Sequence, residues 1–182
     1  MLILPTISII LPNYNHKPYL HKRLDSVFAQ TYQNFEVILL DDASTDGSEE
    51  ILKSYKDHPK VRHLILNSQN SGSPFKQWEK GILLAKGELI WIAESDDFCE
   101  PIFLEQLLKR INDKTGICYS QTIDVDKDSK PLLNRIDYTQ EFNPNIWHRD
   151  FEISGDIFNE KYLLYKNVIP NASAVIFKRN LV

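Results

Sequence analysis

The sequence predicts an α/β fold in which a mostly parallel, Rossmann-like sheet is covered by helices on both faces. Through the first two-thirds of the chain, short apolar runs alternate with segments whose apolar residues recur at helical spacing. This alternation implies right-handed strand–helix–strand crossovers. The chain has 182 residues, 42% of them hydrophobic and 25% charged, which is ordinary for a globular protein with one sizeable core.

Each expected strand is an apolar run bounded by polar or turn-forming residues. The first, 7–11, reads Ile-Ser-Ile-Ile-Leu and precedes the turn Pro-Asn-Tyr-Asn-His. The other runs of this kind are 35–40, 61–66, 88–93 and 116–120.

The expected helices lie between these strands, and each carries an apolar stripe. The first ends near Gln30 and the second covers 48–56. The third, 75–86, should bury Trp78 and be capped at its C-terminus by Gly87. Pro101 opens a fourth helix, since proline suits the first helical turn.

From Gln121 onward the alternation stops. Residues 124–128 suit a hairpin tip or a solvated loop, 157–165 a short helix, and 172–177 a late strand. The chain then ends without a turn signal, which predicts that it is cut from a longer protein.

Three polar clusters follow the carboxyl ends of expected strands. They contain Tyr14, Asp42 and the pair Asp96-Asp97. In open α/β sheets ligands bind outside the carboxyl ends of the strands, so these clusters should meet at one edge.

The pair Asp96-Asp97 predicts a metal site. Adjacent carboxylates repel each other at the end of a core strand unless a positive charge compensates them. A divalent ion is the usual compensation, because Mg²⁺ takes one or two carboxylates together with phosphate oxygens. A helix cap before Pro101 would use one acid, but Glu94 makes three in this loop.

The loop after the second strand could contact a ligand or cap the next helix. Asp42, directly at the strand exit, favours ligand contact, whereas Asp46 and Ser48 favour capping of the next helix. Tyr14 could stack on a nucleobase, although its segment could also be a simple turn. Gly72 could supply a positive φ or let the backbone approach a phosphate.

Composition excludes several other functions. The net charge is −4 and the basic residues are scattered, which argues against a nucleic-acid surface. The five histidines lack zinc-site spacing and are expected to be surface or structural residues. Two cysteines without a disulfide framework predict a reducing, cytoplasmic location. The sequence contains neither an apolar stretch long enough to span a membrane nor a signal peptide, although attachment at the inner face of the membrane stays open.

The ordered motifs resemble family 2 glycosyltransferases, inverting enzymes of the GT-A fold. The pattern begins with strand-Pro-x-Tyr-Asn, continues through Gln-Thr-Tyr at 30–32 and Asp-Asp-x-Ser-x-Asp-Gly-Ser at 41–48, and ends in Ser-Asp-Asp at 95–97. It also includes Asn-x-Gly at 70–72 and Gly-x-x-x-Ala-x-Gly-Glu at 81–88. The resemblance covers residues 5–110 and, more loosely, 171–181.

The resemblance implies a transfer of sugar from a UDP- or dTDP-linked donor to a hydroxyl of a saccharide or lipid-linked saccharide, in surface polysaccharide synthesis. It assigns 1–120 to donor binding and 121–182 to part of the acceptor side. Asp97 would hold Mg²⁺ or Mn²⁺, Asp42 would contact the uracil or thymine ring, and Asp96 would reach the ribose. The remaining expected nucleotide-binding residues are Pro12, Tyr14, Asn15, Ser44, Gly72 and Lys76.

The chain departs from the family pattern at two places. Many relatives carry Arg-Asn where this chain has Trp78-Glu79, so Lys76 is the expected substitute cation for the diphosphate. The family's catalytic base, an acid after the late strand, is not found before Val182, and Asp156 does not match its place. The base is therefore expected beyond Val182, and this stretch should bind nucleotide weakly and transfer little sugar. The alternatives are an inactive nucleotide-binding domain and a sugar nucleotidyltransferase.

Overall fold

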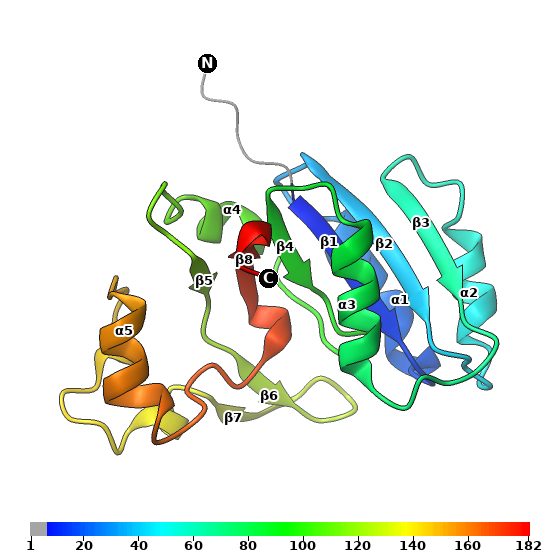
Figure 1. Ribbon diagram of the computed structural model, residues 1–182. Coiled ribbons are helices and arrows are strands. Elements are labelled where there is room, and N and C mark those ends of the chain that lie inside the picture. Colours follow the sequence, from blue (N-terminus) through cyan, green and yellow to red (C-terminus); the bar gives the residue numbers. More distant parts are fainter. Residues whose placement is uncertain (1–6) are drawn as a thin grey trace. The chain divides into compact units, whose positions relative to one another are not determined.

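The computed structural model describes residues 7–182, which form two compact units (Figure 1). The first unit runs to Cys118 and also includes Val175–Val182, and the second unit is Tyr119–Ala174. The expected division at residue 120 placed the last strand with the acceptor side, whereas its residues belong to the first unit. Residues 1–6 of the expected donor-binding part lie outside the described residues.

The first unit contains a six-stranded sheet with a parallel centre, as the sequence predicts. The strand order is β3-β2-β1-β4-β8-β5. The first four strands in this order, β3, β2, β1 and β4, run parallel to one another, and β8 runs antiparallel to β4. The strands are β1 (Ile7–Asn13), β2 (Phe35–Asp41), β3 (Val61–Leu66), β4 (Leu89–Ile92), β5 (Ile117–Tyr119) and β8 (Val175–Lys178).

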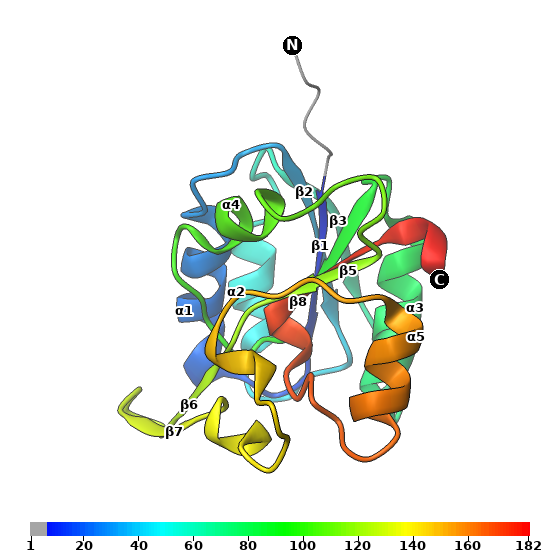
Figure 2. The ribbon, with the colours of Figure 1, turned by 90° about the vertical axis from the view of Figure 1, so that its left-hand side faces the viewer.

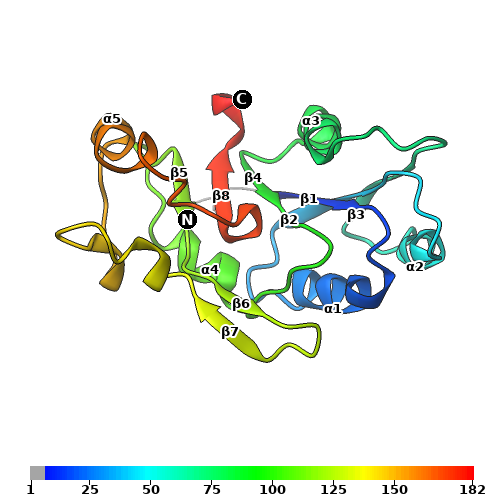
Figure 3. The same cartoon turned by 90° about the horizontal axis from the view of Figure 1, so that it is seen from below.

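Helices cover both faces of this sheet. Figures 2 and 3 show α3 (Pro74–Leu84) on one face and α1 (Lys17–Phe28) with α2 (Ser48–Ser54) on the other. The short helix α4 (Phe103–Leu108) packs its buried residues into the same core as α1 and α2. No helix within residues 7–182 combines the length and the apolar character needed to cross a bilayer.

Side chains that alternate along β1 fill two separate apolar layers. Ile9 points into the larger core, which α1, α2 and α4 close, whereas Ile10 belongs to the smaller core under α3. Successive residues of a strand face opposite sides of the sheet, so a strand buried on both faces is apolar at nearly every position. This explains why the sequence shows continuous apolar runs here.

Two expected helix boundaries are wrong, and so is the expected burial of Trp78. Helix α3 is capped by Ala85 in an extended conformation, and the Gly87 amide instead donates to Ser8 Oγ at 2.8 Å. Pro101 precedes the first residue of α4, Phe103, so it does not open the helix. Trp78 is only partly buried, because its indole N–H reaches a carboxylate at the edge of the sheet.

The second unit is built from a hairpin, short helical turns and a cluster of aromatic side chains. β6 (Ile123–Val125) pairs with β7 (Pro131–Asn134), which confirms a hairpin tip near 124–128. The expected short helix is α5 (Gly155–Phe158) followed by a π-helical turn, Asn159–Leu163. Trp147, Phe158 and Tyr162 form the buried centre of this unit. The remaining segments are 3₁₀ turns at Asp137–Thr139, Ile146–His148 and Ala172–Ala174.

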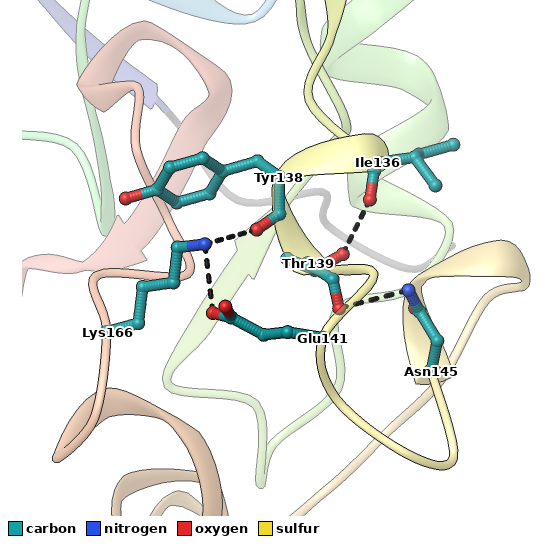
Figure 4. Close-up of polar contacts among 6 residues, drawn as sticks. All are labelled: Ile136, Tyr138, Thr139, Glu141, Asn145 and Lys166. Atoms are coloured by element: carbon teal, nitrogen blue, oxygen red, sulfur yellow. Dashed lines mark hydrogen bonds and ion pairs between the residues drawn. The ribbon is translucent and has the colours of Figure 1, made fainter.

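Polar contacts hold the irregular part of the second unit (Figure 4). The Lys166 ammonium donates to the carbonyl oxygen of Tyr138 at 2.5 Å and lies 2.9 Å from Glu141 Oε1. Thr139 Oγ1 donates to the Ile136 carbonyl, and the Asn145 amide donates to the Thr139 carbonyl. These side-chain bonds add to the backbone hydrogen bonds of the short turns in this segment, such as that from the Thr139 amide to the Ile136 carbonyl at 3.1 Å.

Candidate functional site

A cavity of about 540 Å³ lies in the first unit beside the polar segments that follow β1, β2 and β4. Its position agrees with the expected ligand edge of the parallel strands. Five of the expected site residues line it, namely Pro12, Tyr14, Asp42, Gly72 and Asp96. The other lining residues are Asn13, His16, Asn70, Ser73, Pro74, Gln77, Glu94 and Ser95.

Asp42 is buried at this edge and receives hydrogen bonds from several segments. Its carboxylate accepts from Asn67 Nδ2 at 2.7 Å and from Gln77 Nε2 at 2.8 Å. It also accepts from the backbone amide and the hydroxyl of Ser71 at 2.9 Å and 2.8 Å. Only 4% of Asp42 is exposed, so these donors replace the water that a buried carboxylate loses.

Asn15 and Ser44 connect the two loops that follow β1 and β2. The backbone N–H of Asn15 donates to Ser44 Oγ at 2.9 Å, and the side-chain oxygen Oδ1 of Asn15 accepts from the backbone N–H of Thr45 at 2.8 Å. Asn15 has a φ of 56°, which asparagine tolerates better than most residues. Neither Asn15 nor Ser44 lines the cavity, so in this structure they position its walls.

Gly72 and Lys76 lie near the start of α3. Gly72 has a φ of +78°, as a residue without Cβ permits, and an added Cβ there would meet no atom within 4 Å. Lys76 does not line the cavity, and its ammonium donates to the Ser71 carbonyl at 2.8 Å. The ammonium therefore supports the backbone turn that holds Gly72.

The loop after β4 brings acidic side chains to the same cavity. Asp96 is exposed and lines the cavity, whereas Asp97 is partly buried and lies outside the lining set. Glu94 Oε1 accepts from the Trp78 indole at 2.6 Å. The pKa of Glu94 is raised to about 7, chiefly by burial. The negative charges of Asp96 and Asp97 also raise this pKa, whereas the Trp78 hydrogen bond and the Arg23 charge lower it.

Arg23 supplies a buried positive charge beneath this acidic loop. Its side chain is fully buried, its Nε donates to the Glu94 carbonyl at 2.9 Å, and its guanidinium lies 5.1 Å from the Trp91 ring centroid. Burial lowers the Arg23 pKa, and nearby acidic groups including Asp97 and Glu94 oppose that change. Arg23 thus offsets part of the repulsion between the acidic side chains of this loop, which the sequence predicts to be compensated by a metal ion.

The fit of a divalent ion rests on the chemistry of the available donors. Within residues 7–182, no three His, Cys, Asp or Glu side chains gather closely enough to enclose a metal by themselves. Mg²⁺ commonly uses one or two carboxylates and completes its shell with water and phosphate oxygens. The carboxylates of exposed Asp96 and partly buried Asp97 fit an ion of that kind and do not fit one enclosed by protein ligands alone.

Sequence reasoning missed several residues of the cavity wall, among them His16, Asn13 and Gln77. His16, expected to be structural, lines the cavity, and its Nδ1 lies 2.8 Å from Ser95 Oγ. Asn13 and Gln77 are each 2% exposed and also line it. Asn13 could have been found as a polar residue at the end of a buried strand, next to Tyr14. Gln77 had no comparable signal, because one polar residue on a helix is ordinary.

Comparison with known proteins identifies the family. Residues 8–177 match the family model described as glycosyl transferase family 2. The chain belongs to this family. The match covers both units, and it agrees with the GT-A fold that the motifs imply.

Two relatives and one solved structure illustrate the likeness. Glycosyltransferase GlyG of Streptococcus pneumoniae is 38% identical over 59% of this chain and 36% of its own length. Chondroitin synthase of Pasteurella multocida is 34% identical over 72% of this chain and 14% of its own. The crystal structure of S. aureus TarS 1-349 in complex with UDP-GlcNAc is 31% identical, with a TM-score of 0.51 over 56% of this chain and 29% of that one. The chain spans well under half the length of each of these proteins.

Proposed function

We propose that this chain is the donor-binding part of a glycosyltransferase that moves a sugar from a UDP- or dTDP-linked donor to a hydroxyl acceptor. The observation that carries the proposal is the 540 Å³ cavity at the carboxyl edge of the parallel strands, lined by five residues of the family's motifs. TarS, a similar protein, is seen with UDP-GlcNAc. The likeness to chondroitin synthase supports a role in polysaccharide synthesis with a saccharide or lipid-linked saccharide as acceptor.

The cavity wall suggests how the nucleotide is oriented. Tyr14 is 47% exposed at the cavity, so its ring is open for stacking on the base. Buried Asp42 forms the base side of the pocket, and Asp96 is exposed where a ribose hydroxyl could donate to it. Gly72 leaves the backbone open to the nucleotide.

Asp97 is the proposed protein ligand of Mg²⁺ or Mn²⁺ at this edge, beside the donor diphosphate. A bound divalent ion would act as a Lewis acid that stabilises negative charge on the leaving diphosphate. The protein's own contribution is to hold the carboxylates in place: Arg23 bonds the Glu94 carbonyl, and the Asp97 amide donates to that carbonyl at 3.2 Å.

Transfer to the acceptor also needs a general base. A base must remove the proton of the acceptor hydroxyl. Asp156 is exposed in the first turn of α5 and no observation links it to the cavity, so we assign no base within residues 7–182. The second unit is the proposed acceptor-side region.

Calorimetry with UDP and dTDP, each with and without Mn²⁺, tests the proposal. We expect at least one of them to bind in a metal-dependent manner, and Asp97→Ala to weaken that binding about tenfold or more. Asp57→Ala removes an exposed carboxylate after α2 that does not line the cavity, and it should leave binding unchanged. Nucleotide binding that ignores both the metal and Asp97→Ala would contradict the proposed site.

A further inference from the structure

Gln30 is a buried polar residue that the proposed function does not use. It opens the Gln-Thr-Tyr motif at 30–32, just after α1, and only 1% of it is exposed. It does not line the 540 Å³ cavity. Burying an amide is costly unless its polar atoms are hydrogen-bonded, so the partners of Gln30 indicate what it stabilises.

The Gln30 side chain joins the end of α1 to the chain that leads into α4. Its Nε2 donates to the Ser26 carbonyl at 3.0 Å and to the Glu100 carbonyl at 2.8 Å. Its Oε1 accepts from the backbone N–H of Leu104 at 2.9 Å. A carbonyl oxygen only accepts and a backbone N–H only donates, so these partners fix which end of the amide faces each of them.

Gln30 also acts as a cap for α4 from outside that helix. The first N–H groups of a helix have no partner within it, and a polar side chain at the N-cap usually supplies one. The N-cap residue Ile102 makes no such bond, and Gln30 Oε1 takes its place at Leu104. The backbone N–H of Thr31 donates to the Pro101 carbonyl at 2.8 Å. Two successive residues after α1 therefore hold the chain where α4 begins.

The acidic turn lies between this anchor and a second one. At the start of the turn, the Glu94 carbonyl accepts from the backbone N–H of Asp97 at 3.2 Å and from Arg23 Nε at 2.9 Å. Residues 95–102 contain no helix or strand, so a regular backbone ladder does not hold them. The turn is instead bound at its start by Arg23 in α1 and at its far end by Gln30.

We propose that Gln30 is a positioning residue for the divalent ion at Asp97. By fixing the chain that follows the acidic turn, it holds the Asp97 carboxylate where an ion and the donor diphosphate can share it. This inference rests on the proposed function, because it names a residue that prepares the proposed metal ligand. Groups that hold a metal ligand in place typically contribute about tenfold to a hundredfold to metal affinity.

The test measures how much Mn²⁺ strengthens UDP binding, as the ratio of the UDP affinities with and without Mn²⁺ by calorimetry. Gln30→Leu removes both polar ends of the amide, and we expect it to lower this ratio about tenfold. The UDP affinity without Mn²⁺ should change little, because Gln30 does not line the cavity. Leu52→Ala truncates a buried side chain of α2 and lowers stability without removing a bond to the acidic turn, so it should keep the wild-type ratio.

Hydrogen exchange tests the anchor in the wild-type protein without nucleotide or metal. Leu104 is the second residue of α4, a position where the helix itself offers the N–H no partner. Because Gln30 Oε1 accepts from it, this N–H should exchange about a hundredfold or more slowly than in an unstructured peptide. Exchange at the rate of an unstructured peptide would overturn the inference, whether or not Gln30→Leu folds.

The outcomes separate this inference from the proposed function. Mn²⁺-dependent UDP binding with the same affinity ratio in the wild type and in Gln30→Leu overturns the role of Gln30 while the proposed function stands. An equal fall of the ratio in Gln30→Leu and Leu52→Ala assigns the loss to general stability and also overturns that role. If the wild-type protein binds neither UDP nor dTDP, the proposed function fails and this inference fails with it.

Discussion

Glu94 should make the stability of this protein depend on pH in an unusual direction. Its pKa is raised from an ordinary value of 4.5 to about 7, chiefly by burial. The folded state therefore holds a proton that the unfolded state releases, and stability falls as the pH rises from about 4.5 through about 7. Most structural carboxylates act in the opposite sense, because their pKa values fall on folding.

The size of the effect follows from the shift. A change from 4.5 to about 7 corresponds to at most about 3 kcal/mol of unfolding free energy. Glu94 is only partly buried, so solvent reduces this figure and about 2 kcal/mol is a reasonable expectation. Its hydrogen bond from Trp78 favours the charged form and works in the same direction as solvent.

Urea denaturation at a series of pH values between 4.5 and 8.5, without divalent metal, measures this. Glu94→Gln keeps a carbonyl acceptor for the Trp78 indole but cannot ionise, so its stability should decline less over this range. Glu79→Gln removes a carboxylate from the exposed side of α3 and should retain the wild-type profile. Parallel profiles for the wild type and Glu94→Gln would show that the pKa of Glu94 is not raised on folding.

Two further substitutions test the sheet and its charged edge. Gly81→Ala should lower the unfolding free energy by about 1–3 kcal/mol, because the new Cβ would lie 2.3 Å from Ile10 Cγ2. The matched control is Gly155→Ala, since an added Cβ there would meet no atom within 4 Å. Equal urea midpoints for the two variants would count against the close contact between α3 and β1. Arg23→Met should raise the pKa of Glu94 further, since the Arg23 charge lowers it, so the loss of stability should still begin near pH 4.5 but continue to higher pH than in the wild type; an unmoved upper end of the profile would show that Arg23 does not act on Glu94.

The sequence predicts the central sheet well because its strands are buried on both faces. A strand covered by helices on both sides needs apolar residues at nearly every position, so Phe35–Asp41, which is buried throughout, is predicted to within one residue. Helix ends are predicted less well. Glycine is a common residue at helix C-termini, but the helix has already ended at Ala85. The backbone N–H of Gly87 instead donates a hydrogen bond to Ser8 Oγ on β1.

The site is predictable only in outline. Strand ends indicate where Asp42 and Asp96 lie, since the carboxyl ends of parallel strands share an edge. The partners of Asp42 come from Asn67, Ser71 and Gln77, far along the chain, and no local pattern reveals them. Arg23 was missed for the same reason, because its neighbours at the acidic loop are brought to it only by the fold.

The sequence predicts the hairpin and the short helix of the second unit but not its core, because that core has no regular period. Trp147, Phe158 and Tyr162 meet through short turns and a π-helical segment. Amphipathic patterns identify regular elements, whereas an irregular aromatic cluster leaves no such pattern.

A crystal structure of this chain soaked with UDP and Mn²⁺ would show the nucleotide and the ion in place. We predict the uridine in the cavity beside Tyr14 and Asp42, with the ion bound at Asp97 and to oxygen atoms of the diphosphate. A nucleotide bound elsewhere on the chain, or an ion in this cavity that makes no contact with Asp97, would contradict this prediction.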